Sequence, residues 1–223
     1  MRRIFAIILC VALLASQVFA REDTKYVALT FDDGPSGRFT RALLDGLSAR
    51  GAKATFFLCG YRLELYPREA LRIHEEGHEI GIHGFSHDPM VPMTEQQVTE
   101  QIRRTGALLP RGSHPLLLRP PGGLCAPSVR AGAKRDGLAI VSWSLDPQDW
   151  AVRDADAIVE TVVSRVRDGD VVLLHDMSDS SVEAALRIVD ILSKRGFRFV
   201  TVRELAQIRN TPLKPGEEYY RFG

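Results

Sequence analysis

The chain is poor in three features that would assign it to a specialised class of protein. Its 29 lysines and arginines nearly equal its 28 aspartates and glutamates, for a formal charge of +1, so it lacks the basic excess of nucleic-acid binders. None of its three cysteines has another cysteine two to four residues away, which argues against a cysteine-built zinc site. No apolar run reaches the roughly 20 residues of a membrane span. The remaining composition, 45% hydrophobic and 8% aromatic, is that of an ordinary globular domain.

The first twenty residues have the pattern of an export signal. Arg2 and Arg3 precede an apolar run over 4–15, and the stretch ends with the small residue Ala20. We expect a signal peptide over 1–20 that is cleaved after Ala20, which predicts an extracytoplasmic protein; a retained membrane anchor is the less favoured alternative. Removing 20 of 223 residues and two of 29 positive charges leaves 203 residues with 27 positive and 28 negative charges, a net charge of −1.

Two cysteines, Cys59 and Cys125, remain after the predicted cleavage. Export would put them where a disulfide can persist. A bridge requires Cα atoms within roughly 7 Å of one another, which the sequence does not specify. A disulfide and a pair of buried thiols are therefore equal alternatives at this point.

A repeated pattern, in which a glycine separates a helical stretch from an apolar run, predicts the order of helices and strands. Five stretches of helical character end in a glycine that is followed within a few residues by an apolar or β-branched run, and these glycines are Gly51, Gly77, Gly137, Gly169 and Gly196. Glycine after a helix supplies the left-handed cap conformation, so each one predicts a helix-to-strand turn. Two further apolar runs, at 26–31 and 116–119, bring the expected strands to seven. The expected helices lie near 38–50, 67–76, 94–109, 127–136, 155–168, 181–195 and 203–208.

Strict alternation of strands and helices favours a parallel α/β sheet with helical crossovers, either open and doubly wound or closed into a barrel. No linker, low-complexity run or repeat divides the chain, so we expect a single domain over 21–209. The tail over 210–223 has two prolines and no helix or strand signal, and is expected to be loose or to wrap the outside. In either topology the functional residues gather at the carboxyl ends of the strands.

Ionisable residues follow five of the seven expected strands. The five segments are Asp32-Asp33-Gly34-Pro35, His83-Gly84-Phe85-Ser86-His87, Arg119-Pro120-Pro121-Gly122-Gly123, Asp146-Pro147-Gln148-Asp149-Trp150 and His175-Asp176. Two histidines four residues apart, joined by an aspartate from another loop, form a ligand set that leaves a coordination position open for water, as catalytic zinc and related sites do. Five such segments in phase with the fold predict a hydrolytic metal site, and the acidic pair and His175 weaken the alternative of a merely solvated histidine loop.

A second histidine pattern is interpreted as a false match. Residues 74–78 read His-Glu-Glu-Gly-His, like the motif of zinc proteases, which needs both histidines on one continuous helical face. Gly77 is expected to end the helix between His74 and His78, so the two side chains should diverge. His114, which precedes a proline in a loop, is expected to be a surface residue.

The five segments resemble the ordered motifs of the NodB-homology polysaccharide deacetylases, carbohydrate esterase family four. The segment from Thr30 to Pro35 is the most specific of them, and the resemblance extends to about Thr201. It implies an irregular seven-stranded (β/α) barrel, in agreement with the seven expected strands. It also implies a divalent metal ion, most often zinc, as the cofactor.

The resemblance gives each motif position a role. Asp33, His83 and His87 would be the metal ligands. Asp32 would be the general base that takes a proton from the attacking water, and Arg119 would hold Asp32 in place.

The same resemblance places an acid and a pocket on the other side of the site. His175 would protonate the departing amine, oriented by Asp149. Trp150 and Leu173 would wall a small apolar pocket for the acetyl methyl, and the backbone amide of Gly122 would help to hold the oxyanion. Many relatives have an aromatic residue where Gly122 stands, so the way in which a sugar lies in the site stays open.

Acetamide hydrolysis is the chemistry that such a set serves. An acetamide is stable because its carbonyl is weakly electrophilic and its unprotonated amine leaves badly; a metal addresses the first problem, and a base and an acid, each typically worth about 10²–10⁴-fold, address the second. The predicted function is removal of N-acetyl groups from N-acetylglucosamine residues of an extracytoplasmic polysaccharide, that is, peptidoglycan, a chitin oligomer or an exopolysaccharide. We expect a monomer that binds no nucleic acid. An O-acetyl xylan esterase and a non-catalytic carbohydrate-binding protein on the same fold stay open as alternatives.

Overall fold

The computed structural model describes residues 24–223, so the predicted signal peptide lies outside the described residues. The strands are β1 (Lys25–Gly34), β2 (Thr55–Leu58), β3 (Glu79–Ile82), β4 (Leu117–Leu118), β5 (Ala139–Val141), β6 (Val171–His175), β7 (Phe197–Phe199) and β8 (Glu218–Tyr219). The α-helices are α2 (Arg38–Ala49), α3 (Gly60–Leu65), α4 (Pro67–Glu75), α5 (Glu95–Gly106), α6 (Pro127–Arg135), α7 (Ala155–Arg165), α8 (Asp179–Lys194) and α9 (Val202–Ile208), and a 3-10 turn covers Pro121–Gly123. Within this range no helix is both long enough and apolar enough to cross a bilayer.

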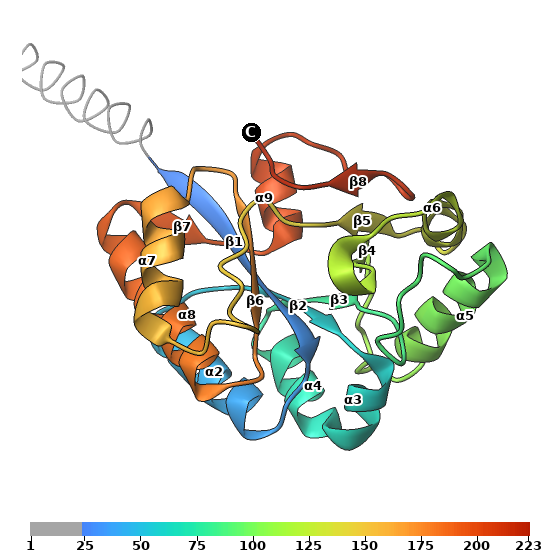
Figure 1. Ribbon diagram of the computed structural model, residues 1–223, viewed down its shortest axis with the longest axis horizontal. Helices are drawn as coiled ribbons and strands as arrows, with labels where there is room; N and C mark the ends of the chain where they lie inside the picture. The colour runs from blue at the N-terminus through green and yellow to red at the C-terminus, as the bar shows by residue number, and fades with distance from the viewer. Residues whose placement is uncertain (1–23) are drawn as a thin grey trace, which may run out of the picture.

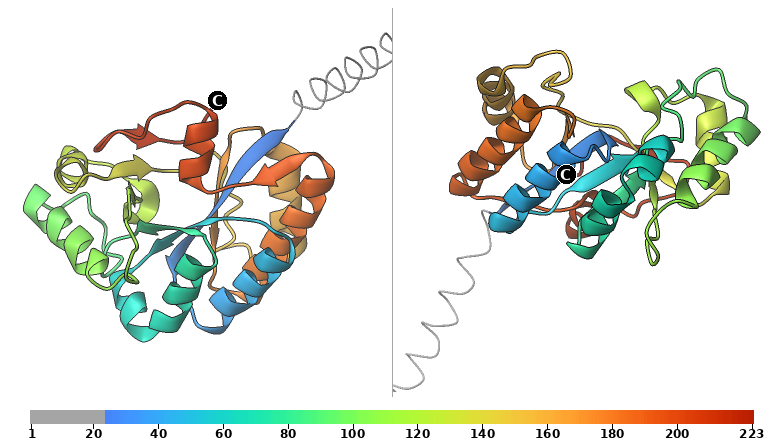
Figure 2. Two further views of the ribbon diagram at one scale, coloured as in Figure 1. Left: turned by 180° about the vertical axis from the view of Figure 1, so that it is seen from behind. Right: turned by 90° about the horizontal axis from the view of Figure 1, so that it is seen from below.

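The strands form one curled parallel sheet. Their order is β6-β1-β2-β3-β4-β5-β8, and β7 pairs with β1 outside this path. The long strand β1 runs through the middle of the molecule, with helices on the outside of the curl (Figures 1 and 2). A parallel bridge between Leu145 and Val172 connects the segment after β5 to β6. The prediction of an irregular seven-stranded α/β barrel in a single domain is confirmed, with β8 as a short addition.

Cap chemistry sets the helix boundaries. Thr94 accepts a hydrogen bond from the backbone N–H of Gln97 in a capping box at the start of α5, and Ser178 accepts one from the N–H of Ser181 at the start of α8. The five glycines that were expected to end helices all have positive φ, between 60° and 86°. The helix-to-strand turns are therefore confirmed where the sequence predicts them.

Two elements were not expected from the sequence. The six-residue helix α3 precedes α4 and is separated from it by Tyr66, and β8 pairs in the tail with β5, opposite Ile140 and Val141. The tail packs firmly, because Phe222 is 1% exposed and an added Cβ at Gly169 would lie 1.8 Å from its carbonyl oxygen. Packing thus continues to Phe222, beyond residue 209 where the sequence analysis ended the domain.

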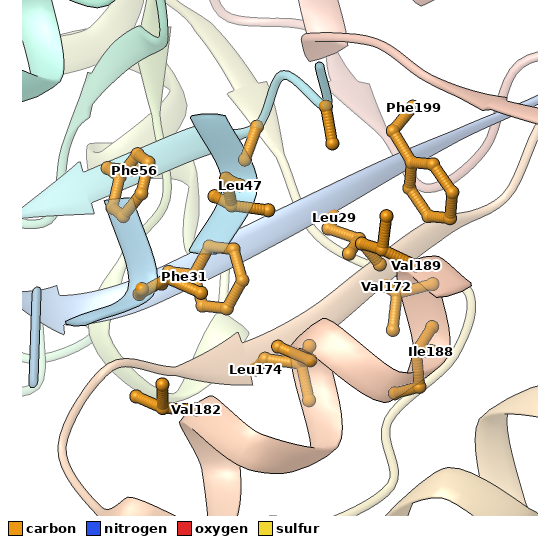
Figure 3. Packing of buried hydrophobic residues seen from close by; sticks show 14 of the residues in the cluster. Leu29, Phe31, Leu47, Phe56, Val172, Leu174, Val182, Ile188, Val189 and Phe199 are labelled. Atoms are coloured by element: carbon orange, nitrogen blue, oxygen red, sulfur yellow. The ribbon is translucent and has the colours of Figure 1, made fainter. Parts of the chain in front are cut away.

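The largest apolar cluster lies between the sheet and the helices around α8 (Figure 3). Leu29 and Phe31 of β1 point into this cluster. Because side chains alternate along a strand, Thr30 and Asp32 face the opposite side, the interior of the barrel. The packing of β1 against the helices therefore directs its polar residues toward the site.

Both described cysteines are free thiols, so the thiol alternative holds and the disulfide does not. Cys59 is fully buried where β2 leads into α3, and burial raises the pKa of its thiol. Cys125 is half-buried after the 3-10 turn.

Candidate active site

Asp32 and Asp33 reach the site from the end of β1. The sheet register pairs Asp32 with His175 of β6, which places the two side by side. Pairing with β2 shifts between Asp32 and Gly34, and Asp33 takes a left-handed φ of 69°. Consecutive side chains on a regular strand point to opposite faces, and an irregularity of this kind re-aims one of them. Both carboxylates therefore reach the same site.

Two histidines from the loop after β3 meet Asp33. Its Oδ1 lies 3.3 Å from Nε2 of His83 and 2.9 Å from Nε2 of His87. His87 reaches inward with a φ of 64°. These three ligand atoms lie within 4.8 Å of one another, and among the described residues this is the group of histidine, cysteine and acidic side chains close enough to share an ion.

The donor atoms of this group fit a divalent metal ion. Nδ1 of His83 lies 2.7 Å from the carbonyl oxygen of Arg119 and must donate, because a carbonyl only accepts; this assigns the lone pair that is available to a metal to Nε2. That lone pair faces Oδ1 of Asp33, which is buried and has no hydrogen-bond partner among the described residues. Two imidazole nitrogens and a carboxylate oxygen that converge on one point are the arrangement of electron-pair donors that a cation satisfies.

The electrostatics of the group agree with this interpretation. Burial acts to raise the pKa of Asp33, but the neighbouring His83 and His87 outweigh it and hold that pKa well below its usual range. Conversely, the nearby carboxylate of Asp33 raises the pKa of His87. The carboxylate is therefore ionised at any ordinary pH, as a metal ligand has to be.

Arg119 holds Asp32 from inside the barrel. The guanidinium is fully buried, and its Nη1 donates to Oδ1 of Asp32 and to the Thr30 hydroxyl, each at 2.7 Å. Nε and Nη2 donate to the carbonyls of Val141 and Ser142, so every nitrogen of the group has an acceptor. One carboxylate oxygen of Asp32 is thus fixed, while Oδ2 faces His83 Nε2 at 3.7 Å.

His175 is held by Asp149 through two contacts. Its ring Nδ1 lies 2.8 Å from Oδ1 of Asp149, and its backbone N–H donates to Oδ2 of the same carboxylate at 2.8 Å. Burial acts to lower the pKa of His175, but the hydrogen bond and charge of Asp149, with smaller contributions from Asp32 and Asp33, raise it to about 9. The ring is therefore protonated at neutral pH, and with Nδ1 occupied by Asp149 its transferable proton is at Nε2.

A cavity of about 150 Å³ adjoins these groups. It is lined by Asp33, Asp149, Trp150, Arg153, His175, Met177, Ser178 and Ser181. Trp150, expected in the acetyl pocket, lies at its rim with 61% of its surface exposed. Leu173 is 4% exposed and is not among the lining residues, where Met177 is found instead. Gly122 lies in the 3-10 turn after β4 with a φ of 70°.

The remaining histidines lie elsewhere. His78 is buried and accepts the backbone N–H of Ala54 at Nδ1, and burial lowers its pKa to about 4. It lines a separate cavity with His74 and His114, and none of the three belongs to the metal-binding group. The helix α4 ends before Gly77 and neither histidine belongs to the metal-binding group, in agreement with a false protease motif, but His74 and His78 line one cavity and do not diverge as expected.

A family model described as "Polysaccharide deacetylase" matches residues 20–141, more than half of the chain. The chain belongs to the polysaccharide deacetylase family. This match covers the β1 aspartates, the histidine loop and Arg119, so three of the five resembling segments lie inside it.

Individual members of the polysaccharide deacetylase family agree over most of the chain. A peptidoglycan-N-acetylglucosamine deacetylase of Bacillus cereus is 38% identical over 192 residues, covering 83% of this chain and 90% of the relative. The peptidoglycan-N-acetylmuramic acid deacetylase PdaC of Bacillus subtilis is 35% identical over 187 residues, 83% of this chain, although the chain spans only 39% of that protein. A family 4 acetyl xylan esterase of Clostridium thermocellum, solved with a cobalt ion, superposes with a TM-score of 0.82 at 33% identity, over 88% of this chain and 98% of the esterase.

Proposed function

We propose that the chain is a metal-dependent deacetylase that removes N-acetyl groups from N-acetylglucosamine residues of a polysaccharide outside the cytoplasm. The observation that carries the proposal is the arrangement of two different proton-transfer groups around one metal-binding group. Asp32 stands beside the ligands Asp33, His83 and His87, and His175 borders the same cavity. Hydrolysis of an amide needs a base and an acid at one carbonyl.

Asp33, His83 and His87 would hold the ion. Two imidazoles and one carboxylate are a ligand set of catalytic zinc, so we propose zinc. When bound, such an ion polarises the acetyl carbonyl and makes an adjacent water more acidic.

Asp32 takes the proton of the attacking water. One of its oxygens is held by the buried Arg119, so the other can accept a proton without the side chain turning away. The two neighbouring carboxylates thus differ in role because Asp33 faces the metal-binding histidines and Asp32 faces an arginine.

His175 donates a proton to the departing amine. With a pKa of about 9 it carries that proton throughout the neutral range. Asp149 binds both its ring and its backbone N–H, and this fixes the direction of Nε2. The acetyl methyl fits the adjoining cavity, where Trp150 and Met177 provide its apolar walls.

Peptidoglycan is the proposed polymer because both bacillary relatives are named for it. The similarity to an acetyl xylan esterase keeps an ester substrate as the second candidate, since the same groups would cleave a more reactive bond. A non-catalytic carbohydrate-binding protein is less favoured because Asp32, Asp33, His83, His87 and His175 are all present.

Acetate release tests the proposal. Purified protein is incubated with N-acetylglucosamine oligomers, peptidoglycan glycan strands and acetylated xylan, with and without a chelator. We expect release from the N-acetylated substrates that stops with chelator and returns with added zinc. Release that is insensitive to the chelator would refute metal dependence, and glycan binding without release would favour the non-catalytic alternative.

A further inference from the structure

Asp176 is a buried acid to which the proposed mechanism gives no task. It follows His175 at the end of β6 and is fully buried. Its Oδ2 accepts a hydrogen bond from the Thr40 hydroxyl, while Oδ1 has no hydrogen-bond partner among the described residues. Leaving a buried carboxylate oxygen unpaired costs roughly 1–3 kcal/mol or more, so a folded protein that retains one needs a compensating reason.

The contacts of Asp176 all lead to the turn that follows Asp33. The Thr40 hydroxyl, which donates to Asp176, itself accepts the backbone N–H of Ser36 at 2.7 Å. The Ser36 hydroxyl donates to the backbone carbonyl of Asp176. Two hydrogen-bonded routes therefore join Asp176 to Ser36, three residues beyond the metal ligand.

A third contact is steric and lies one residue from the ligand. A Cβ added at Gly34 would lie 2.6 Å from Oδ1 of Asp176, closer than real Cβ atoms approach an oxygen. Gly34 is not among the glycines with positive φ, so its backbone does not require glycine. The lack of a side chain at Gly34 is therefore explained by the carboxylate of Asp176 lying against it.

These contacts bear on the conformation of Asp33. Its left-handed φ of 69° is unfavourable for a residue with a side chain and persists only where the surroundings hold it. The backbone on one side of Asp33 is fixed by β1, and on the other side by the Gly34–Ser36 turn that packs on Asp176.

We infer that Asp176 is a positioning residue for the metal site: it fixes the turn after β1 so that Asp33 presents Oδ1 to His83 and His87. It also ties this turn to the end of β6, which carries His175, so that the ligand side and the acid side of the site keep one spacing. Burial raises the pKa of Asp176 to about 7, so the neutral form is well populated and an amide can replace it. The inference rests on the proposed metal site.

Zinc affinity of the purified protein, measured by competition with a chromophoric chelator and without any glycan, tests this role. Loss of an outer partner of a metal ligand typically weakens affinity about 10–100-fold, and we expect this for Asp176→Leu and for Thr40→Val. Because both remove the same hydrogen bond, the double variant should be no weaker than the worse single variant. Asp176→Asn keeps an acceptor for Thr40 and should stay within about threefold of the wild type, since only the unpaired oxygen is changed.

Asp170 provides the matched control. It is 5% exposed at the start of β6, at the opposite end of the same strand, and accepts hydrogen bonds from Ser144 and from the N–H of Arg167. Asp170→Leu should lower the urea midpoint without changing zinc affinity. A loss of zinc affinity in Asp170→Leu equal to that in Asp176→Leu would reduce Asp176 to a stability residue.

A size exchange gives a second, independent test. Gly34→Ala should weaken zinc binding about 10-fold or more, since the added methyl displaces the turn. Shortening the opposing residue makes room for it, so Gly34→Ala combined with Asp176→Ala should bind zinc no more weakly than Asp176→Ala alone. Full additivity of the two losses would overturn the inference, as would wild-type affinity of Asp176→Leu. A wild-type protein that binds no zinc would instead refute the proposed function.

Discussion

The contact between Asp149 and His175 gives the sharpest prediction, because opposing effects on one pKa can be separated. Burial lowers the pKa of His175, and the hydrogen bond and charge of Asp149 more than reverse this and take it to about 9. Asp149→Asn removes the charge but keeps a side chain of the same shape. With burial left as the largest influence, the pKa of His175 should fall below its ordinary value of about 6.5.

The consequence for catalysis has a definite sign. An acid with a pKa of about 9 is charged throughout the neutral range, and one below 6.5 is mostly neutral at pH 7.5. We therefore expect the alkaline fall of kcat/KM for acetate release to move to or below the neutral range in Asp149→Asn, with a loss of about 10-fold or more at pH 7.5, since about a tenth of the enzyme or less then carries the proton.

The raised pKa of His175 also contributes to the stability of the fold. A group whose pKa is higher in the folded chain than in the unfolded chain stabilises the fold. This contribution is fully present at a pH below the pKa of the unfolded chain, and it is lost as the pH rises through the pKa of the folded chain. Between 6.5 and about 9, at 1.36 kcal/mol per pH unit, the contribution to the free energy of unfolding is at most about 3 kcal/mol, present below pH 6.5 and gone above about pH 9.

A proton NMR titration of the imidazole in the metal-free protein, together with the pH profile of kcat/KM, checks the reasoning. The metal-free form is the correct reference because Asp32 and Asp33 contribute to the raised pKa and a bound cation would offset their charge. A wild-type pKa near 6.5, or an alkaline limb that stays in place in Asp149→Asn, would refute the assignment of His175 as an acid set by Asp149.

Four further outcomes follow from the site. Asp32→Asn should abolish acetate release while zinc stays bound, whereas His87→Ala should lose both; equal zinc loss, measured by atomic absorption, would mean that base and ligand are misassigned. Arg119→Leu leaves the Asp32 carboxylate buried without its partner and should lower the free energy of unfolding in urea by about 3–5 kcal/mol. Removing zinc with a chelator should lower the thermal midpoint, because an ion present at 100 times its Kd adds about 2.7 kcal/mol of stability; an unchanged midpoint would contradict a resident ion. Arg153 is an exposed cation in the cavity lining and should favour substrates that bear a carboxylate. Arg153→Gln should therefore lower kcat/KM severalfold on muramoyl-containing glycan strands but not on neutral N-acetylglucosamine oligomers. An equal fall on both substrates would argue against this charge effect.

The sequence was informative where local chemistry decides the structure. Glycines such as Gly137 and Gly196 end helices because they adopt a positive φ, and this can be read from residue type and position alone. The strand-end rule then brings Asp33, His83 and His175 to one edge without any knowledge of distances. These side chains could be grouped as a candidate site because their positions depend on where each strand ends.

Features that depend on tertiary packing could not be read in this way. The strand β8 is two residues long and exists because it can pair with β5, and no local signal marks such a strand. Cys125 packs at the edge of the apolar cluster around α5 and α6, and Cys59 is buried where β2 leads into α3, placements that only the fold specifies. Asp176 sits beside His175 in the sequence, yet its importance lies in contacts with residues about 140 positions earlier, Ser36 and Thr40.

Side chains at the floor of the candidate site are buried, and side chains at the rim of its cavity are exposed. We expect the first group to affect the reaction and the second to affect the choice of substrate. Arg119 and Asp176 are fully buried, and they hydrogen-bond to Asp32 and to the segment after Asp33, respectively. Trp150, at 61% exposure, and Arg153 lie at the rim, where we expect a substitution to affect contacts with a glycan more than the packing of the fold. A family that acts on peptidoglycan in one member and on xylan esters in another is consistent with a fixed floor and a variable rim. For this chain, substitutions at the floor should therefore alter zinc affinity and kcat, and substitutions at the rim should alter KM and the ratio of activities between glycans.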